Sequence, residues 1–174
     1  ELAARLGITI VDHLAGMDAL IDGAMPRPLA AYGCDVITIG SASKAFWGGL
    51  RVGWIRATSH SVGHFTAVKS AEDLGTSIPA QIVTAKCLYR IQAAREYRRQ
   101  TLGAARAFML NLLAERLADW QPLLPAGGAS MWVRLPEGYS ATATVEKAAR
   151  AGIDVLPGPT FSSETALDNF VRLS

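Results

Sequence analysis

Lysine, serine and arginine side chains gather within residues 41–51, which read SASKAFWGGLR. Lys44 directly follows an apolar segment, with Ser41 three residues before it and Arg51 seven residues after it. A lysine that bonds covalently to a carbonyl compound needs such a setting, because a nearby cation and hydroxyl groups can hold the negatively charged part of the ligand. The segment is a candidate covalent site, with an ordinary polar loop as the alternative.

Two chemical interpretations fit this spacing. A serine three residues before a lysine is typical of a serine nucleophile activated by that lysine, as in penicillin-binding enzymes, which also carry Ser-x-Asn and Lys-Thr-Gly elements downstream. Neither element occurs in this sequence. The acyl-enzyme interpretation is therefore weak, and a lysine that binds a carbonyl cofactor is favoured.

Three short apolar segments predict the strands that position these side chains. They are residues 8–12 (ITIVD), 35–40 (DVITIG) and 50–56 (LRVGWIR). Continuous apolar runs of this kind are typical of strands that helices cover on both faces. The link between the second and third segments is short for a parallel crossover, so we expect the third strand to run antiparallel to the second.

This antiparallel return brings Arg51, at the start of the third strand, to the same edge of the expected sheet as Ser41 and Lys44. Asp12 stands at the carboxyl end of the first strand, where α/β sheets bind ligands. The alternative for Asp12 is a helix cap or turn former. The alternative for Ser41 is a cap of the following turn.

The pattern from Pro79 to Trp120 predicts helix, and a long helix here would link two domains. The arginines at positions 95, 98, 99 and 106 form either a phosphate-binding stripe or a solvated helix face, and the solvated face is favoured. Apolar residues recur at helical spacing, namely Leu102, Ala105, Phe108, Met109, Leu112, Leu113 and Leu117.

After Pro122 the sequence predicts a small α+β unit. Strands are expected at residues 129–135, 153–156 and 169–173, and a helix is expected at residues 141–151.

Composition limits the classes of protein. The chain has 174 residues, of which 50% are hydrophobic, so it is globular, and its net charge of +2 is too small to imply nucleic acid. Cys34 and Cys87 favour buried free thiols in a reducing compartment, so we expect a cytoplasmic protein. His13, His60 and His64 lack ligand spacing, so no metal is expected. No apolar run is long enough to cross a membrane.

The ends of the sequence indicate a fragment of a longer protein. The chain starts without Met inside a helix-like segment and stops in NFVRLS, which has the pattern of an unfinished strand.

Residues 41–54, SASKAFWGGLRVGW, resemble the cofactor-lysine signature of class I/II aminotransferases of fold type I: Ser-x-Ser-Lys, then Gly-Leu-Arg-x-Gly-Trp. GGASMWVRLP at residues 127–136 resembles the small-domain strand of that family. VLPGPTF at residues 155–161 and NFVRLS at residues 169–174 resemble its carboxyl-terminal segment. The motif FWGGLR at residues 46–51 is most similar to the corresponding sequence in MocR regulators, which are GntR-type transcription factors with an aminotransferase-like half.

The resemblance implies an α/β fold and two partial domains. Residues 1–94 would be the second half of a large domain that binds pyridoxal phosphate, with a mainly parallel sheet and one antiparallel strand. Residues 95–174 would be the interdomain helix and a small α+β carboxyl-terminal domain.

The resemblance also implies roles for the candidate residues around the lysine. Lys44 would be the catalytic residue and would hold pyridoxal 5′-phosphate as an aldimine, and we expect it to be buried beside Arg51. Arg51 would bind the cofactor phosphate, with hydroxyl groups from Ser41 and Ser43.

Two further residues match the family pattern, and one departs from it. Asp12 would pair with the protonated pyridine nitrogen of the cofactor, and Arg172 would bind a substrate carboxylate. Aminotransferases commonly carry a tyrosine three residues after this aspartate, where the present chain has Ala15.

Two functions of different class follow from the resemblance. One is the effector-sensing half of a MocR/GntR-type regulator, which binds an amino acid and contacts DNA only through a domain outside these residues. The other is a stand-alone aminotransferase that moves an amino group between an amino acid and a 2-oxo acid. The resemblance further implies a homodimer.

Overall fold

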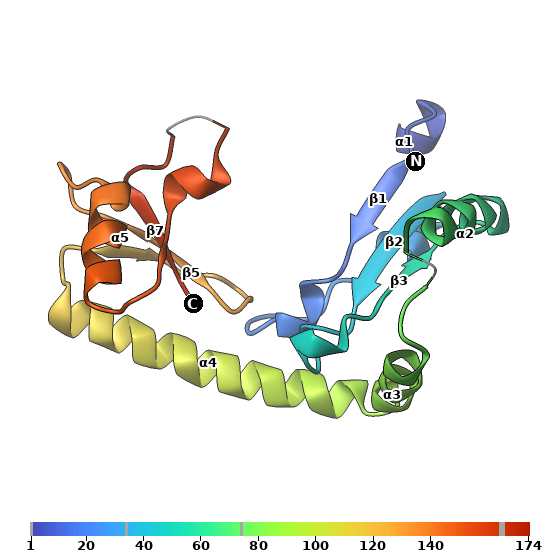
Figure 1. The fold of residues 1–174 in the computed structure, drawn as a ribbon, viewed down its shortest axis with the longest axis horizontal. Helices are drawn as coiled ribbons and strands as arrows, with labels where there is room; N and C mark the ends of the chain where they lie inside the picture. The colour runs from blue at the N-terminus through green and yellow to red at the C-terminus, as the bar shows by residue number, and fades with distance from the viewer. Residues whose placement is uncertain (1, 34, 74, 164–165) are drawn as a thin grey trace. The chain divides into compact units, whose positions relative to one another are not determined.

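The computed structural model describes residues 2–33, 35–73, 75–163 and 166–174 (Figure 1). The chain forms two compact units, Glu1–Arg99 and Gln100–Ser174. Cys34 lies outside the described residues. Cys87 is a free thiol, as predicted, but it is half-buried rather than buried.

A three-stranded sheet with the order β1-β2-β3 forms the centre of the first unit. β1 (Ile10–His13) runs parallel to β2 (Val36–Ser41), and β3 (Gly53–Arg56) returns antiparallel to β2. The predicted fold class and the antiparallel return are therefore confirmed. The alternating burial along β2 agrees with a central strand, because successive side chains point to opposite faces.

The third strand is shorter than the sequence predicts. It begins at Gly53, because residues Gly48–Leu50 form a 3₁₀ turn, η3, that delays the return of the chain. The adjacent glycines in this turn favour it over extended backbone. Arg51 is therefore not part of a strand, and it adopts a left-handed backbone with φ of 51°.

Helices complete the first unit, and the last of them, α4 (Ile91–Arg116), continues beyond Arg99 into the second unit. The expected helix at the start of the chain is α1 (Leu2–Arg5), and Gly7 after it has a φ of +65°. α2 (Ser59–Asp73) was not predicted from the sequence. The long helical segment divides into α3 (Ile78–Leu88) and α4.

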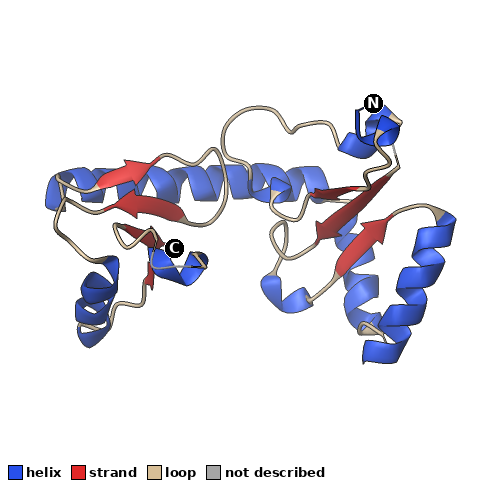
Figure 2. Ribbon diagram, turned by 90° about the horizontal axis from the view of Figure 1, so that it is seen from above, coloured by secondary structure: helices blue, strands red, loops and turns tan. Residues whose placement is uncertain are grey.

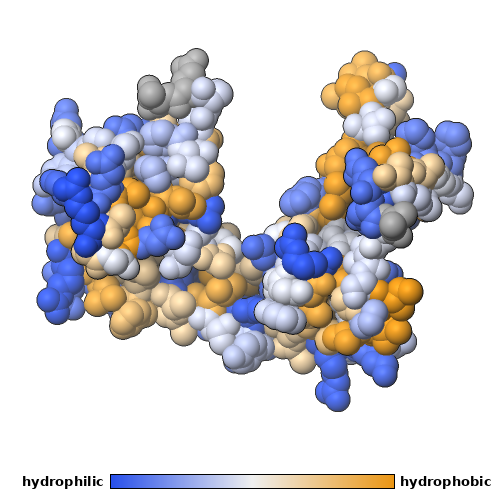
Figure 3. Space-filling view, viewed as in Figure 1, coloured by the Kyte–Doolittle hydropathy of each residue, from blue (hydrophilic) through white to orange (hydrophobic). Residues whose placement is uncertain are grey.

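Apolar side chains remain exposed on the first unit. Figure 3 shows them gathered over α1 and β1, where Leu2, Leu6, Ile8 and Val11 are each more than half exposed. Exposed apolar surface of this kind is typically covered by another segment or partner.

The second unit contains an antiparallel sheet with the order β4-β5-β7-β6 (Figure 2). Its strands are β4 (Gln121–Leu123), β5 (Met131–Arg134), β6 (Leu156–Pro157) and β7 (Phe170–Leu173), and α5 (Ala141–Arg150) precedes β6. β4 was not predicted, and β6 starts three residues later than expected. One face of the sheet carries the core, in which Met131, Val133 and Val171 pack with Leu113 of α4 and Ala141 of α5.

Asp168 stabilises the start of α5. Its Oδ1 accepts hydrogen bonds from the backbone N–H of Thr142 at 3.1 Å and from the Thr142 hydroxyl at 2.9 Å. The backbone hydrogen bond from Thr142 is the main cause that lowers the pKa of Asp168 below its ordinary value of 3.8. The carboxylate therefore contributes stability at neutral pH, which is lost as the pH falls through the lowered pKa.

Candidate functional site

The loop that carries Lys44 follows directly on β2. The Ser41 hydroxyl accepts a hydrogen bond from the backbone N–H of Ser43 at 3.2 Å, and the backbone N–H of Phe46 donates to the Ala42 carbonyl at 3.0 Å. Ala42 and Ala45 are both 4% exposed and hold the loop against the unit. The loop is thus a compact turn with local backbone hydrogen bonds.

The η3 turn brings Arg51 back to this end of β2. The backbone N–H of Ala42 donates to the Val52 carbonyl at 3.0 Å, and Ser41 is paired with Gly53. Ser41, Ser43, Lys44 and Arg51 therefore lie at one edge of the sheet, as expected. A left-handed φ at a non-glycine residue costs free energy, and such strain concentrates at functional sites.

Lys44 is exposed in the described structure, so the expectation of a buried lysine is wrong for these residues. The two buried alanines of the loop face the unit and leave the side chain of Lys44 outside it. Neither the Lys44 ammonium nor the Arg51 guanidinium has a hydrogen bond or ion pair with any described residue. Two unpaired cations at one edge, with hydroxyl groups beside them, suit an anionic ligand.

Asp12 lies within β1 and is paired with Thr38 of β2, three residues before Ser41. Its Oδ2 accepts a hydrogen bond from the backbone N–H of Leu29 at 2.9 Å, so the carboxylate caps the turn that begins there. A carboxylate has two acceptor oxygens, so the Oδ1 of Asp12 can still accept a hydrogen bond from a further donor. The described contacts do not join Asp12 to Lys44.

Arg172 belongs to the second unit, on β7. Its guanidinium carbon lies 5.0 Å from the centroid of the Phe161 ring, and its Nε is buried without a hydrogen-bond partner among the described residues. A buried guanidinium nitrogen that lacks a partner is costly, so a carboxylate ligand would satisfy it. This observation is consistent with the role that the sequence suggests for Arg172.

Arg95 and Arg98 of the cluster on α4, like Arg106, are partly buried and do not form a solvated face, although the sequence favours that interpretation. Arg95 Nε donates to Asp18 Oδ1 at 2.7 Å, and these side chains are 32% and 14% exposed. Arg98 Nη2 donates to the Phe46 carbonyl at 2.8 Å. Sequence reasoning missed both contacts, because their partners are more than fifty residues away along the chain.

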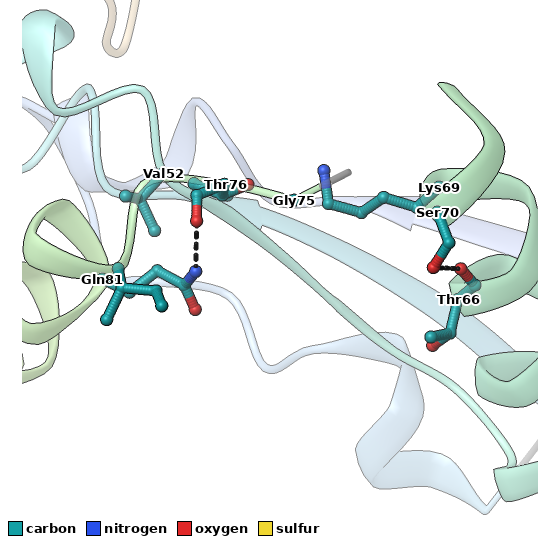
Figure 4. Close-up of a pocket in the computed structure, with 9 residues that line it drawn as sticks. Val52, Thr66, Lys69, Ser70, Gly75, Thr76 and Gln81 are labelled. Atoms are coloured by element: carbon teal, nitrogen blue, oxygen red, sulfur yellow. Dashed lines mark hydrogen bonds between the residues drawn. The ribbon is translucent and has the colours of Figure 1, made fainter. Parts of the chain in front are cut away.

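A separate cavity of about 460 Å³ lies between β3, α2 and α3. Its polar groups bond to one another: Gln81 Nε2 donates to the Thr76 carbonyl, and the Ser70 hydroxyl donates to the Thr66 carbonyl, both at 2.8 Å (Figure 4). Lys69, which also lines it, forms an ion pair with Asp73 at 2.7 Å. Lys44 does not line this cavity.

Within residues 2–33, 35–73, 75–163 and 166–174, no group of His, Cys, Asp and Glu side chains is arranged to hold a metal ion. No helix in the described parts of the chain has the length and apolar character needed to span a bilayer.

Residues 12–174 match the family model of aminotransferase class I and II. The chain belongs to this family. Class I and II aminotransferases use pyridoxal 5′-phosphate, so the cofactor predicted from the lysine segment is confirmed for the family. The residues at the end of β2 fit that group, because they combine an amine for its aldehyde with an unpaired guanidinium and two hydroxyl groups for its phosphate.

Two curated relatives show two kinds of protein. The chain is 29% identical over 185 residues to aromatic-amino-acid aminotransferase 1 of Thermococcus litoralis, covering 100% of this chain and 43% of the relative. It is 30% identical over 161 residues to the uncharacterized HTH-type transcriptional regulator YdfD of Bacillus subtilis, covering 88% of this chain and 33% of the relative. The chain thus spans less than half the length of either protein.

A solved structure with the same fold is the alpha-aminoadipate aminotransferase LysN of Thermus thermophilus, complexed with N-(5′-phosphopyridoxyl)-L-leucine. Its sequence is 25% identical, the TM-score is 0.89, and the match covers 99% of this chain and 46% of that chain. This similarity confirms the predicted fold-type-I architecture over the described residues.

Proposed function

We propose that this chain is part of a protein that binds pyridoxal 5′-phosphate covalently through Lys44. The observation that supports the proposal best is the pair of unpaired cations, Lys44 and Arg51, beside Ser41 at one edge of the sheet. Lys44 would hold the cofactor through its aldehyde, and the cofactor would supply an electron-withdrawing ring to a bound amino acid.

The remaining residues have roles that follow from their chemistry. The guanidinium of Arg51 would hold the phosphate by paired hydrogen bonds, and the hydroxyls of Ser41 and Ser43 would add neutral donors. Asp12 Oδ1 would accept a hydrogen bond from the protonated ring nitrogen, while Oδ2 keeps the hydrogen bond that the Leu29 backbone N–H donates. Arg172 would bind the carboxylate of an amino acid.

Arg51→Gln is expected to weaken binding of pyridoxal phosphate to the full-length protein by about tenfold, the order of one charged hydrogen bond. Arg51→Lys is expected to lose most of the same affinity, because an ammonium cannot form the paired contact. Equilibrium titration followed by absorbance measures both. Equal affinity of Arg51→Gln and wild type would show that Arg51 does not bind the phosphate.

The effector-sensing half of a MocR/GntR-type regulator is the favoured context, in the cytoplasm and as a homodimer. Its support comes from the relatives named as HTH-type regulators and from Ala15, which places a methyl group where aminotransferases commonly carry a phenol. Cofactor exchange with an amino acid would then shift a conformational equilibrium, and DNA would be bound through a domain outside these residues. A stand-alone aminotransferase is the alternative, supported by the relative from Thermococcus litoralis.

The two contexts predict different responses of the full-length, cofactor-loaded protein to amino acids. For a regulator, an amino acid that changes the cofactor spectrum is expected to change affinity for promoter DNA upstream of its own gene, with little 2-oxo acid formed. Gel-shift titration and chromatography of 2-oxo acids measure the two outcomes. Sustained 2-oxo acid production without any DNA binding would contradict the regulator and favour the enzyme.

A further inference from the structure

The start of α4 is anchored to the loop that carries Lys44. Arg98 Nη2 donates to the carbonyl of Phe46 at 2.8 Å, and Arg98 Nε lies 3.4 Å from the carbonyl of Ala45. These two carbonyls belong to the residues that directly follow Lys44. The side chain of Arg98 is partly buried at these contacts, and all four residues lie in the first unit.

The hydrogen bonds from Arg98 restrain the orientation of the Ala45 and Phe46 carbonyls. A guanidinium is planar and permanently charged, so two of its N–H groups reach adjacent carbonyls only when those carbonyls are fixed relative to each other. The other hydrogen bonds of the loop join residues two to ten positions apart, the longest being from Ala42 to Val52, whereas Arg98 is 52 residues from Phe46. Arg98 therefore attaches the loop to the body of the unit.

The same helix face also holds the segment that follows β1. Arg95, one turn before Arg98, pairs with Asp18 at 2.7 Å, and Asp18 lies in the 3₁₀ turn Met17–Ala19. Residues three apart on a helix lie on one face. One helix face thus contacts the loop that carries Lys44 and the turn that follows β1, the strand that carries Asp12.

We propose that Arg98 is a positioning residue for Lys44: it holds the carbonyls of residues 45 and 46 so that the lysine meets the cofactor aldehyde in one orientation. The inference rests on the proposed function. Without this anchor, the turn keeps its local hydrogen bonds but samples several directions, and fewer of them place the amine for attack.

The test uses the full-length protein with Arg98→Gln and Arg98→Lys, with Arg106→Gln as the matched control. Arg106 Nη1 also donates to a backbone carbonyl, that of Pro125 at 2.6 Å, but within the second unit. Pyridoxal phosphate is added to the protein without cofactor, and the link to Lys44 is trapped over time with borohydride and quantified by mass spectrometry. Deuterium uptake of residues 42–50 is measured in the same cofactor-free proteins.

Arg98→Gln is expected to slow formation of the trapped link by about tenfold and to raise deuterium uptake of the loop. Arg98→Lys is expected to be intermediate, because it keeps the charge without the fork, and Arg106→Gln is expected to match wild type. Equal rates for Arg98→Gln and wild type, or equal slowing by Arg98→Gln and Arg106→Gln, would overturn the inference while the proposed function stands. Absence of any trapped link in wild type would overturn both.

Discussion

Lys44→Ala in the full-length protein is expected to abolish the visible absorbance of the lysine-linked cofactor and to weaken binding of pyridoxal phosphate by about a hundredfold, or roughly 2.8 kcal/mol. The physical reason is that only the covalent bond is lost. Arg51 and Ser41 still offer their phosphate contacts at the end of β2, so weak, reversible binding remains. Absorbance spectra and equilibrium dialysis measure the two effects.

Lys69→Ala is the matched control for this prediction. Lys69 is about half exposed on α2 and already forms an ion pair with Asp73, so its loss is expected to leave the absorbance band unchanged. A band that persists in Lys44→Ala would contradict the assignment of the cofactor lysine. A band lost equally in both variants would point to general damage to the fold and would leave no special role for Lys44.

Gly158→Ala is expected to destabilise the second unit by about 3 kcal/mol, the upper range for adding a methyl group where no space exists. A Cβ at Gly158 would collide with the backbone of Leu167, namely its carbonyl oxygen and carbon. Leu167 itself has a left-handed φ of 66°, so this backbone has little freedom to move away. Chemical denaturation of the full-length protein, followed by tryptophan fluorescence that includes Trp132, measures the change in the free energy of unfolding.

Gly63→Ala is the control for this prediction, because it is expected to raise the stability that Gly158→Ala lowers. Gly63 lies inside α2, and no atom stands within 4 Å of the Cβ that alanine would add. Alanine there is expected to stabilise the helix by about 0.5–1 kcal/mol, because it restricts the unfolded chain and favours helix. Equal stability of Gly158→Ala and wild type would contradict the prediction, because it would show that the turn after β6 can shift to accommodate a methyl group.

The sequence predicts the central strands well, because β2 is rich in β-branched residues and β5 is mainly apolar. β2 and β5 are found close to where their residues indicate them. α2 was not predicted because its large apolar residues are few, namely Val62, Phe65 and Val68, and polar residues and Gly63 separate them, so its helical periodicity is weak. β4 was not predicted because it is only three residues long and contains Pro122.

At the candidate site, contacts between residues close in sequence were predictable, and contacts between residues far apart in sequence were not. Lys44, Ser41 and Arg51 are close in sequence and joined by a short return, so their shared edge was predictable from strand direction alone. The anchoring contact of Arg98 was not, since charge pattern on a helix cannot say which loop lies against it. The exposure of Lys44 also depended on tertiary packing, because burial of Ala42 and Ala45 decides which side of the turn faces solvent.

The most direct test of the central claim is to load the full-length protein with pyridoxal 5′-phosphate, reduce it with borohydride and map the modified lysine by peptide mass spectrometry. We predict a pyridoxyl group on Lys44 in nearly every molecule and none on Lys69, Lys86 or Lys147. Modification spread over those exposed lysines, or located on any lysine other than Lys44, would contradict the account.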